Sequence, residues 1–203
     1  MAARPASLLR SSLFLSFCTR SKRSNRRGLH QSLVLFRQSP VVHHTDVSYV
    51  RGPSSPPLVD LTIGETLSRA AETWPDREAL VVPFQQVRRT FREVLEEVDR
   101  LAAGLLGLGL EPGDRLGMWG PNSHEWYLTQ FAAARAGLVL VNVNPAYQPA
   151  ELRYALNKVG VSGIVSSERF KTQEYHSMLA QVAPELTHSR PGQVSSPAVP
   201  SLR

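Results

Sequence analysis

The stretch 113–147 constrains the fold more than any other part of the sequence. An apolar strand pattern at 115–119 is broken by Gly120-Pro121, an amphipathic segment follows, and a second apolar run fills 138–143 before Asn144-Pro145 breaks it. Strands that alternate with helices predict parallel strands joined by right-handed crossovers. The sequence therefore indicates an α/β fold built on an incomplete doubly wound, mostly parallel sheet.

Capping boxes mark where three of the predicted helices begin. In a capping box a hydroxyl or amide side chain accepts from the backbone N–H three residues on, and a carboxylate there reaches back. The predicted pairs are Thr62 with Glu65, Thr90 with Glu93 and Asn122 with Glu125. The helix after Asn122 is expected to bury Trp126, Tyr127, Phe131 and Ala134.

Strand patterns fill the spaces between the helices. Residues 78–82 and 87–90 predict a β-hairpin, and 161–166 predict a third parallel strand after a helix over 149–159. The apolar run at 138–143 is typical of a strand buried on both faces of a parallel sheet.

Four glycines, at positions 104, 107, 109 and 113, superficially suggest a dinucleotide-binding loop. Such a loop must follow a strand and open a helix. Here the glycines close a helix and precede a strand, so we interpret them as helix caps and turn residues.

The first 45 residues hold eight basic residues and no acid, whereas residues 46–203 hold 15 basic and 17 acidic residues. The high pI therefore reports the leader, and the near-neutral body argues against nucleic-acid binding. An Arg- and Ser-rich, acid-free leader is typical of a mitochondrial transit peptide. A secretory signal, from the short apolar run at 13–15, and a disordered basic tail are the alternatives.

Composition divides the chain into four predicted parts. Residues 1–45 are the leader, 46–57 a Pro- and Ser-rich linker, 58–185 the α/β domain and 186–203 a disordered tail without periodicity. The sequence has no run of 18 apolar residues, which predicts no membrane span. Its only cysteine, Cys18, lies in the leader, so no cysteine-based chemistry is expected in the domain.

Several short motifs occur in a fixed order along the domain. They are Thr90-Phe91-Arg92-Glu93, Leu108-Gly109-Leu110-x-x-Gly113-Asp114-Arg115, Gly117-Met118-Trp119-Gly120-Pro121-Asn122-Ser123, Ala136-Gly137, Asn144-Pro145-Ala146-Tyr147 and Lys158-Val159-Gly160. Together they resemble the N-terminal region of the adenylate-forming acyl-CoA synthetases, over about residues 57 to 185.

The resemblance implies the chemistry of that family. A fatty acid, expected to be of medium chain length, reacts with ATP to give an acyl-adenylate and pyrophosphate, and coenzyme A then displaces AMP. It further implies ATP, Mg²⁺ and coenzyme A as cofactors or substrates of a full-length enzyme, and the leader suggests the mitochondrial matrix. The family's phosphate loop, of the Ser-Gly-Thr-Thr-Gly type, and its later Thr-Gly-Asp motif are not in this sequence. No catalytic, cofactor-binding or metal-binding residue can therefore be assigned, and the chain is expected to be a truncated form that is inactive alone.

A few side chains are weak candidates for ligand contact. Asn122, Asn144 and Tyr147 follow predicted strands, where ligands gather in doubly wound sheets, but capping and turn formation explain the two asparagines as well. His124 and His176 are interpreted as surface residues. Trp119, Trp126 and Phe131 are interpreted as core, and Arg88, Arg89 and Arg92 as a solvated face, while the adjacent pair His43-His44 makes a poor metal site.

A second hypothesis is a non-catalytic binding module. An unfinished parallel sheet leaves unpaired edges, which favours pairing with a full-length subunit, another mitochondrial partner or a second copy of the chain.

Overall fold

The computed structural model describes residues 52–53, 55–190 and 192–203. The chain divides into two units, residues 1–59 and 60–203, and the helices and strands described below all lie in the second. The predicted leader at 1–45, with its candidate pair His43-His44, falls outside the described residues. Among those that are described, no helix is long and apolar enough to cross a membrane.

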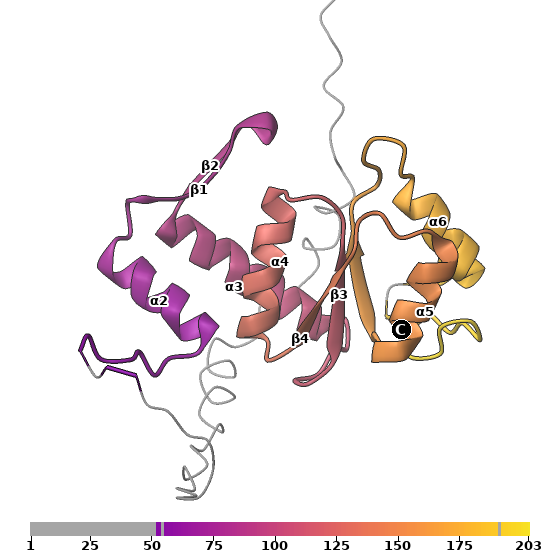
Figure 1. The fold of residues 1–203 in the computed structure, drawn as a ribbon, viewed down its shortest axis with the longest axis horizontal. Coiled ribbons are helices and arrows are strands. Elements are labelled where there is room, and N and C mark those ends of the chain that lie inside the picture. The colour runs from indigo at the N-terminus through magenta and orange to yellow at the C-terminus, as the bar shows by residue number, and fades with distance from the viewer. Residues whose placement is uncertain (1–51, 54, 191) are drawn as a thin grey trace, which may run out of the picture. The chain divides into compact units, whose positions relative to one another are not determined.

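A three-stranded parallel sheet forms the centre of this unit (Figure 1). The strands β3 (Arg115–Trp119), β4 (Val139–Val143) and β5 (Gly163–Ser166) lie in the order β4-β3-β5. The predicted α/β class with a parallel sheet is confirmed. The prediction that 138–143 is buried on both faces is wrong, because β4 is an edge strand of this sheet and Val139 is 50 % exposed.

Helices cover both faces of the sheet, as Figure 1 shows. On one side lie α2 (Ile63–Thr73), α3 (Phe91–Gly107) and α4 (His124–Arg135). On the other lie α5 (Pro149–Val159) and α6 (Tyr175–Val182). Each face has its own apolar core, because successive residues of β3 point to opposite sides: Leu116 joins the core of α2, α3 and α4, and Trp119 joins that of α5 and α6.

The hairpin is a second, separate sheet. Strands β1 (Glu78–Val82) and β2 (Val87–Thr90) pair antiparallel, as predicted, through the short 3₁₀ turn η1 (Pro83–Gln85). Gln86 closes the turn with a left-handed backbone, φ 56°. The hairpin extends from the helices that cover one face of the parallel sheet (Figure 1).

Two of the three predicted capping boxes are confirmed. Thr62 with Glu65 caps α2, and Thr90 with Glu93 caps α3. The third prediction is wrong: the N-cap of α4 is Ser123, whose hydroxyl accepts from the backbone N–H of Trp126. Ser123 and Trp126 have the same i, i+3 spacing as the expected pair, so spacing alone could not choose between neighbouring residues.

The last residues differ from the expectation of a disordered tail. After η2 (Pro184–Thr187), residues 192–203 lie against the second core, where Val199 and Leu202 are 2 % and 3 % exposed. The Arg203 backbone N–H donates to Ser162 O at 3.0 Å, and the Arg203 guanidinium pairs with Asp114. Two buried apolar side chains and a few polar contacts hold this segment in place. Such contacts produce no helical or strand periodicity in the sequence, which is why the segment was predicted to be disordered.

Candidate functional site

The candidate site is the edge of the sheet where the three parallel strands end. The loops 120–123, 144–148 and 167–174 follow β3, β4 and β5 at this edge. Ligands of doubly wound sheets bind outside the carboxyl ends of the strands. The question is whether these loops leave room and polar groups for a ligand.

The loop after β4 uses its asparagine to shape a turn. The Asn144 side-chain oxygen accepts from the Ala146 backbone N–H at 2.9 Å, and its backbone carbonyl accepts from the Trp119 indole N–H at 3.0 Å. The Tyr175 hydroxyl donates to Pro145 O at 3.1 Å. Of the two interpretations of Asn144, turn formation is therefore the one that the structure supports.

The loop after β3 lies directly against the loop after β5. A side chain at Gly120 would place its Cβ 2.5 Å from Ser167 Oγ, and the Ser167 backbone N–H donates to Trp119 O at 3.2 Å. Asn122 is exposed and is not the helix cap. The loops after β4 and β5 are also joined, since Gln173 bonds to Gln148. The loop after β5 therefore contacts both of the other loops.

A shallow open depression lies beside the loop after β4. It measures about 340 Å³ and is lined by Tyr147, Ala150, Glu151 and Tyr154. Glu151 is already engaged, because it accepts from the Gln148 backbone N–H as part of the cap of α5. Tyr147 packs on the second core, and Tyr154 is 68 % exposed. The depression lacks the enclosed apolar walls of a small-molecule site.

The aromatic residues that were predicted to be core differ in how deeply they are buried. Trp119 is fully buried and stands edge-on to Tyr175, with ring centroids 4.5 Å apart. Burial raises the pKa of the Tyr175 hydroxyl above its ordinary value. Trp126, Tyr127 and Phe131 are only partly buried, and the fully buried face of α4 consists instead of Leu128, Thr129, Ala132 and Ala133.

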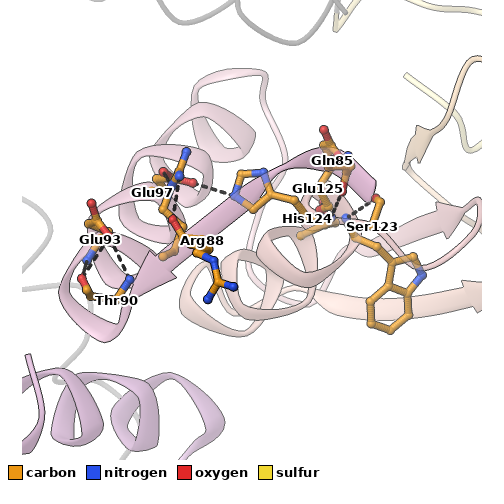
Figure 2. A network of polar contacts seen from close by, with 11 residues as sticks. Gln85, Arg88, Thr90, Glu93, Glu97, Ser123, His124 and Glu125 are labelled. Atoms are coloured by element: carbon orange, nitrogen blue, oxygen red, sulfur yellow. Dashed lines mark hydrogen bonds and ion pairs between the residues drawn. The ribbon is translucent and has the colours of Figure 1, made fainter. Parts of the chain in front are cut away.

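A cluster of polar side chains joins the hairpin, α3 and α4 (Figure 2). His124 Nε2 lies 2.8 Å from Glu97 Oε2, and the Arg89 guanidinium donates to the other oxygen of Glu97 at 2.5 Å. The His124 side chain is only 14 % exposed, which differs from its interpretation as a surface residue. Of the three arginines interpreted as a solvated face, Arg88 and Arg92 are 68 % and 58 % exposed, whereas Arg89 is 32 % exposed. The two partners of Glu97 are 27 and 8 residues away from it, a separation that helical periodicity does not reveal. His176, in contrast, is exposed on α6, as predicted.

The same cluster includes Gln85 at the hairpin turn and Glu125 in the first turn of α4. Gln85 accepts from the His124 backbone N–H at 2.7 Å and donates to Glu125 Oε2 at 2.9 Å. Burial by itself would raise the pKa of Glu125, but hydrogen bonds from Gln85, its own backbone and Ser123, together with His124, hold it below its ordinary value. Glu125 is therefore an ionised acceptor near neutral pH.

Neither the depression beside the β4 loop nor the polar cluster has the features of a metal site. Within the described part of the chain, no group of three or more His, Cys, Asp or Glu residues is arranged to hold a metal ion. The carboxylates of Glu97 and Glu125 have protein donors as partners, which is the arrangement of a structural network.

Comparison with known proteins identifies the family of the chain. Residues 67–200 match the family model of the AMP-binding enzymes. The chain belongs to this family. It is 52 % identical over 156 residues to the mouse medium-chain acyl-CoA ligase ACSF2, mitochondrial, and 50 % identical over 156 residues to the human protein of that name. The putative acyl-CoA synthetase YngI of Bacillus subtilis is 34 % identical over 146 residues.

The match covers 77 % of this chain but 25 % of the mouse and human proteins, so the chain spans about a quarter of their length. Solved structures agree in fold. The N-terminal domain of FACL13 from Mycobacterium tuberculosis superposes with a TM-score of 0.58 at 26 % identity, over 66 % of this chain and 33 % of that one. A putative long-chain-fatty-acid CoA ligase from Rhodopseudomonas palustris has a TM-score of 0.56 at 32 % identity, over 62 % and 30 %. The resemblance to adenylate-forming acyl-CoA synthetases is confirmed.

Proposed function

We propose that this chain is the N-terminal portion of an ATP-dependent ligase that joins medium-chain fatty acids to coenzyme A in the mitochondrial matrix. The observation that supports the proposal is the identity of 50–52 % to mitochondrial medium-chain acyl-CoA ligases over about three quarters of the chain. The reaction forms an acyl-adenylate and pyrophosphate from the fatty acid and ATP, after which coenzyme A displaces AMP.

Within such an enzyme, residues 60–203 supply scaffold. A nucleotide triphosphate needs backbone N–H groups and cations that converge on its phosphates. The sequence lacks a Ser/Thr/Gly-rich phosphate loop, and the loops after β4 and β5 are hydrogen-bonded to each other through Gln148 and Gln173. The residues present do not fit ATP or Mg²⁺, and we assign no catalytic step to them.

The 203-residue chain is accordingly expected to be inactive alone. The test is release of pyrophosphate and formation of acyl-CoA from octanoate, ATP and coenzyme A, with the purified chain at micromolar concentration. Turnover above a reaction without protein would contradict this part of the proposal and leave the family assignment untouched.

A chimera tests the ligase assignment directly. Residues 60–185 of this chain would replace the aligned segment of the mouse mitochondrial medium-chain acyl-CoA ligase, to which the chain is 52 % identical over 156 residues. We expect a folded enzyme that activates octanoate within about tenfold of the parent, because core substitutions that preserve volume and pattern are tolerated. The parent and a chimera with Trp119→Ala, which removes a fully buried side chain, are the matched controls. A folded chimera without ligase activity would contradict the assignment.

The second candidate function is a non-catalytic binding module. Within residues 60–203, β4 and β5 each pair with β3 on one side only, so the sheet has two open edges. Pairing with a full-length ligase subunit or a second copy would cover such an edge. Co-purification of the tagged chain with the full-length mouse ligase tests this, and the same chain with Val139→Lys at the β4 edge is the control.

The remaining proposals concern the leader. Residues 1–45 act as a mitochondrial transit peptide, followed by a linker at 46–57. Fusion of residues 1–57 to a fluorescent protein should direct it to mitochondria, and replacement of Arg20, Arg23 and Arg27 by Ala should prevent this. Secretion of the fusion would favour the alternative reading of the leader.

A further inference from the structure

The β1–β2 hairpin is weakly anchored by apolar contacts at its turn. It forms a two-stranded sheet apart from the parallel sheet, and such a sheet alone is marginally stable in water. Val82 is buried, but Val81 and Phe84 are 41 % and 75 % exposed. At the opposite end, backbone bonds from Phe91 to Arg77 and from Arg92 to Pro75 tie the hairpin to the start of α3. The turn therefore needs another anchor.

Gln85 provides that anchor by capping α4 from a distant part of the chain (Figure 2). The first backbone N–H groups of a helix have no partner inside it. Ser123 accepts from the Trp126 N–H, whereas Gln85, 39 residues before His124, accepts from the His124 N–H and donates to Glu125. A single amide side chain thus joins the hairpin turn to the first two residues of α4.

Glu97 on α3 closes the same network. Its two oxygens bind Arg89 of β2 and His124 of α4, and its side chain is 18 % exposed. Hydrogen bonds that involve ionised groups away from bulk water are stronger than neutral ones. The contacts of Gln85 and Glu97 with their partners, which we call the latch, are all polar and join elements that the parallel sheet does not connect.

The latch acts where a loop of the candidate site ends and α4 begins. His124 directly follows loop 120–123, and Gly120 in that loop lies against Ser167 of the loop after β5. The first turn of α4 therefore has the hairpin turn on one side and the carboxyl edge of the sheet on the other.

We propose that the hairpin is a latched arm, and that release of the latch opens the hairpin turn and the first turn of α4 with loop 120–123 as one unit. The parallel sheet, α3 and the rest of α4 stay folded in the open state. Because coupling between two sites is reciprocal, a ligand that orders loop 120–123 would also tighten the hairpin turn. This inference does not depend on the ligase proposal.

Amide hydrogen exchange on the full chain tests the coupling. With Gln85→Ala, we expect exchange at Gln86 in the turn and at His124, Trp126 and Tyr127 in α4 to accelerate together by about tenfold or more, since one hydrogen bond to the charged Glu125 and one from the His124 backbone N–H are lost. The reference is Ala136, near the end of α4, which should change little. The control variant is Arg88→Ala, which breaks the exposed Arg88–Glu78 pair on the same hairpin and should leave α4 unchanged.

A variant on the other side of the latch separates coupling from local damage. Glu125→Ala alters α4 alone, yet we expect faster exchange at Gln86, and Glu125→Gln, which keeps an acceptor for Gln85, should restore most of the protection. In the double variant Gln85→Ala, Glu125→Ala, the effects should not add. Exchange that rises in the hairpin without rising in α4, or additive effects in the double variant, would overturn the proposal. If Gln85→Ala also speeds exchange at Ala136, the variant has disturbed α4 as a whole. The comparison of Glu125→Ala with Glu125→Gln at Gln86 then tests the coupling instead: no faster exchange with Glu125→Ala, or no recovery with Glu125→Gln, would overturn it.

Discussion

At the scale of single residues, two partly buried hydrogen bonds hold the loop after β4, in addition to the turn that its asparagine forms. Trp119 and Tyr175 stack edge to face, and each donates to a backbone carbonyl of that loop, at Asn144 and Pro145. Both donor side chains are fully buried and the bonds themselves are partly buried, so removal of either donor takes away a bond that holds this loop. Trp119, predicted to be core, and Tyr175 thus both contribute to the shape of a candidate ligand loop.

Tyr175→Phe tests this arrangement. The ring remains, but the hydroxyl that donates to Pro145 O is lost, so we expect a loss of about 1 kcal/mol in the free energy of unfolding. Urea denaturation followed by tryptophan fluorescence measures it. Tyr154→Phe, at a ring that is 68 % exposed, is the matched control and should have almost no effect. Equal effects of the two variants would show that the Tyr175 hydroxyl contributes nothing.

Asp114 makes the stability of the fold depend on pH in the acidic range. A backbone hydrogen bond from Glu111 holds its pKa below the ordinary value against burial, with help from Arg203 and Ser162. Because the folded pKa is lowered, this stabilisation is fully present above the unfolded pKa of about 4 and is lost as pH falls through the folded value.

The predicted consequence is a difference between Asp114→Asn and the unaltered chain that is large at pH 7 and shrinks below about pH 4. Urea midpoints measured at several pH values between 2.5 and 7 give that difference. Asp76→Asn, at a side chain that is 87 % exposed in its pair with Arg92, serves as the control. A difference that stays constant with pH would contradict the role given to Asp114.

At the scale of elements, sequence patterns located the helices and strands but did not predict which other elements each of them contacts. Thr62 and Thr90 cap α2 and α3 because the capping signal is local, contained within four residues. The edge position of β4 depends on which strands pair, which an apolar run cannot encode. For the candidate site, the sequence predicted the location at the carboxyl ends of the strands but not the contacts between the side chains there. The latch was missed because Gln85 and His124 lie 39 residues apart and meet through tertiary folding.

The C-terminal segment shows a second limit of periodicity. Residues 192–203 have no helix or strand pattern, yet Val199 and Leu202 fill positions in the core of α5 and α6. A bond from the Asn157 side chain to Ala198 O, at 2.8 Å, holds the segment further. A few isolated apolar residues can therefore order a segment that composition alone would assign to disorder.

Leu202→Ala measures how much this segment contributes. Its side chain is 3 % exposed, so we expect a loss of roughly 2–3 kcal/mol in the free energy of unfolding. Exchange of the Arg203 N–H, which donates to Ser162 O, should also accelerate. Leu108→Ala, the same change at a leucine that is 43 % exposed, is the control. If both variants were equally stable, the segment would not be part of the core.

At the scale of the whole chain, the family match and the open sheet bear on one question: what covers the edges of β4 and β5. The chain spans about a quarter of the length of its mitochondrial relatives. Within the described residues it presents a three-stranded sheet in which β4 and β5 each have one unpaired edge. An unpaired strand offers a row of backbone N–H and C=O groups to another strand. At β4 this row is accompanied by Val139, which is half exposed.

We therefore expect the isolated chain to associate with itself through β4 at high concentration. Sedimentation velocity of the 203-residue chain across a hundredfold range of concentration should reveal an association that Val139→Lys weakens, because charged side chains on an edge strand oppose pairing. Tyr154→Lys places the same charge on α5, at another exposed apolar side chain, and should leave the association unchanged. A chain that remains monomeric throughout would contradict the binding-module hypothesis at this edge, and equal weakening by both variants would trace the association to surface charge.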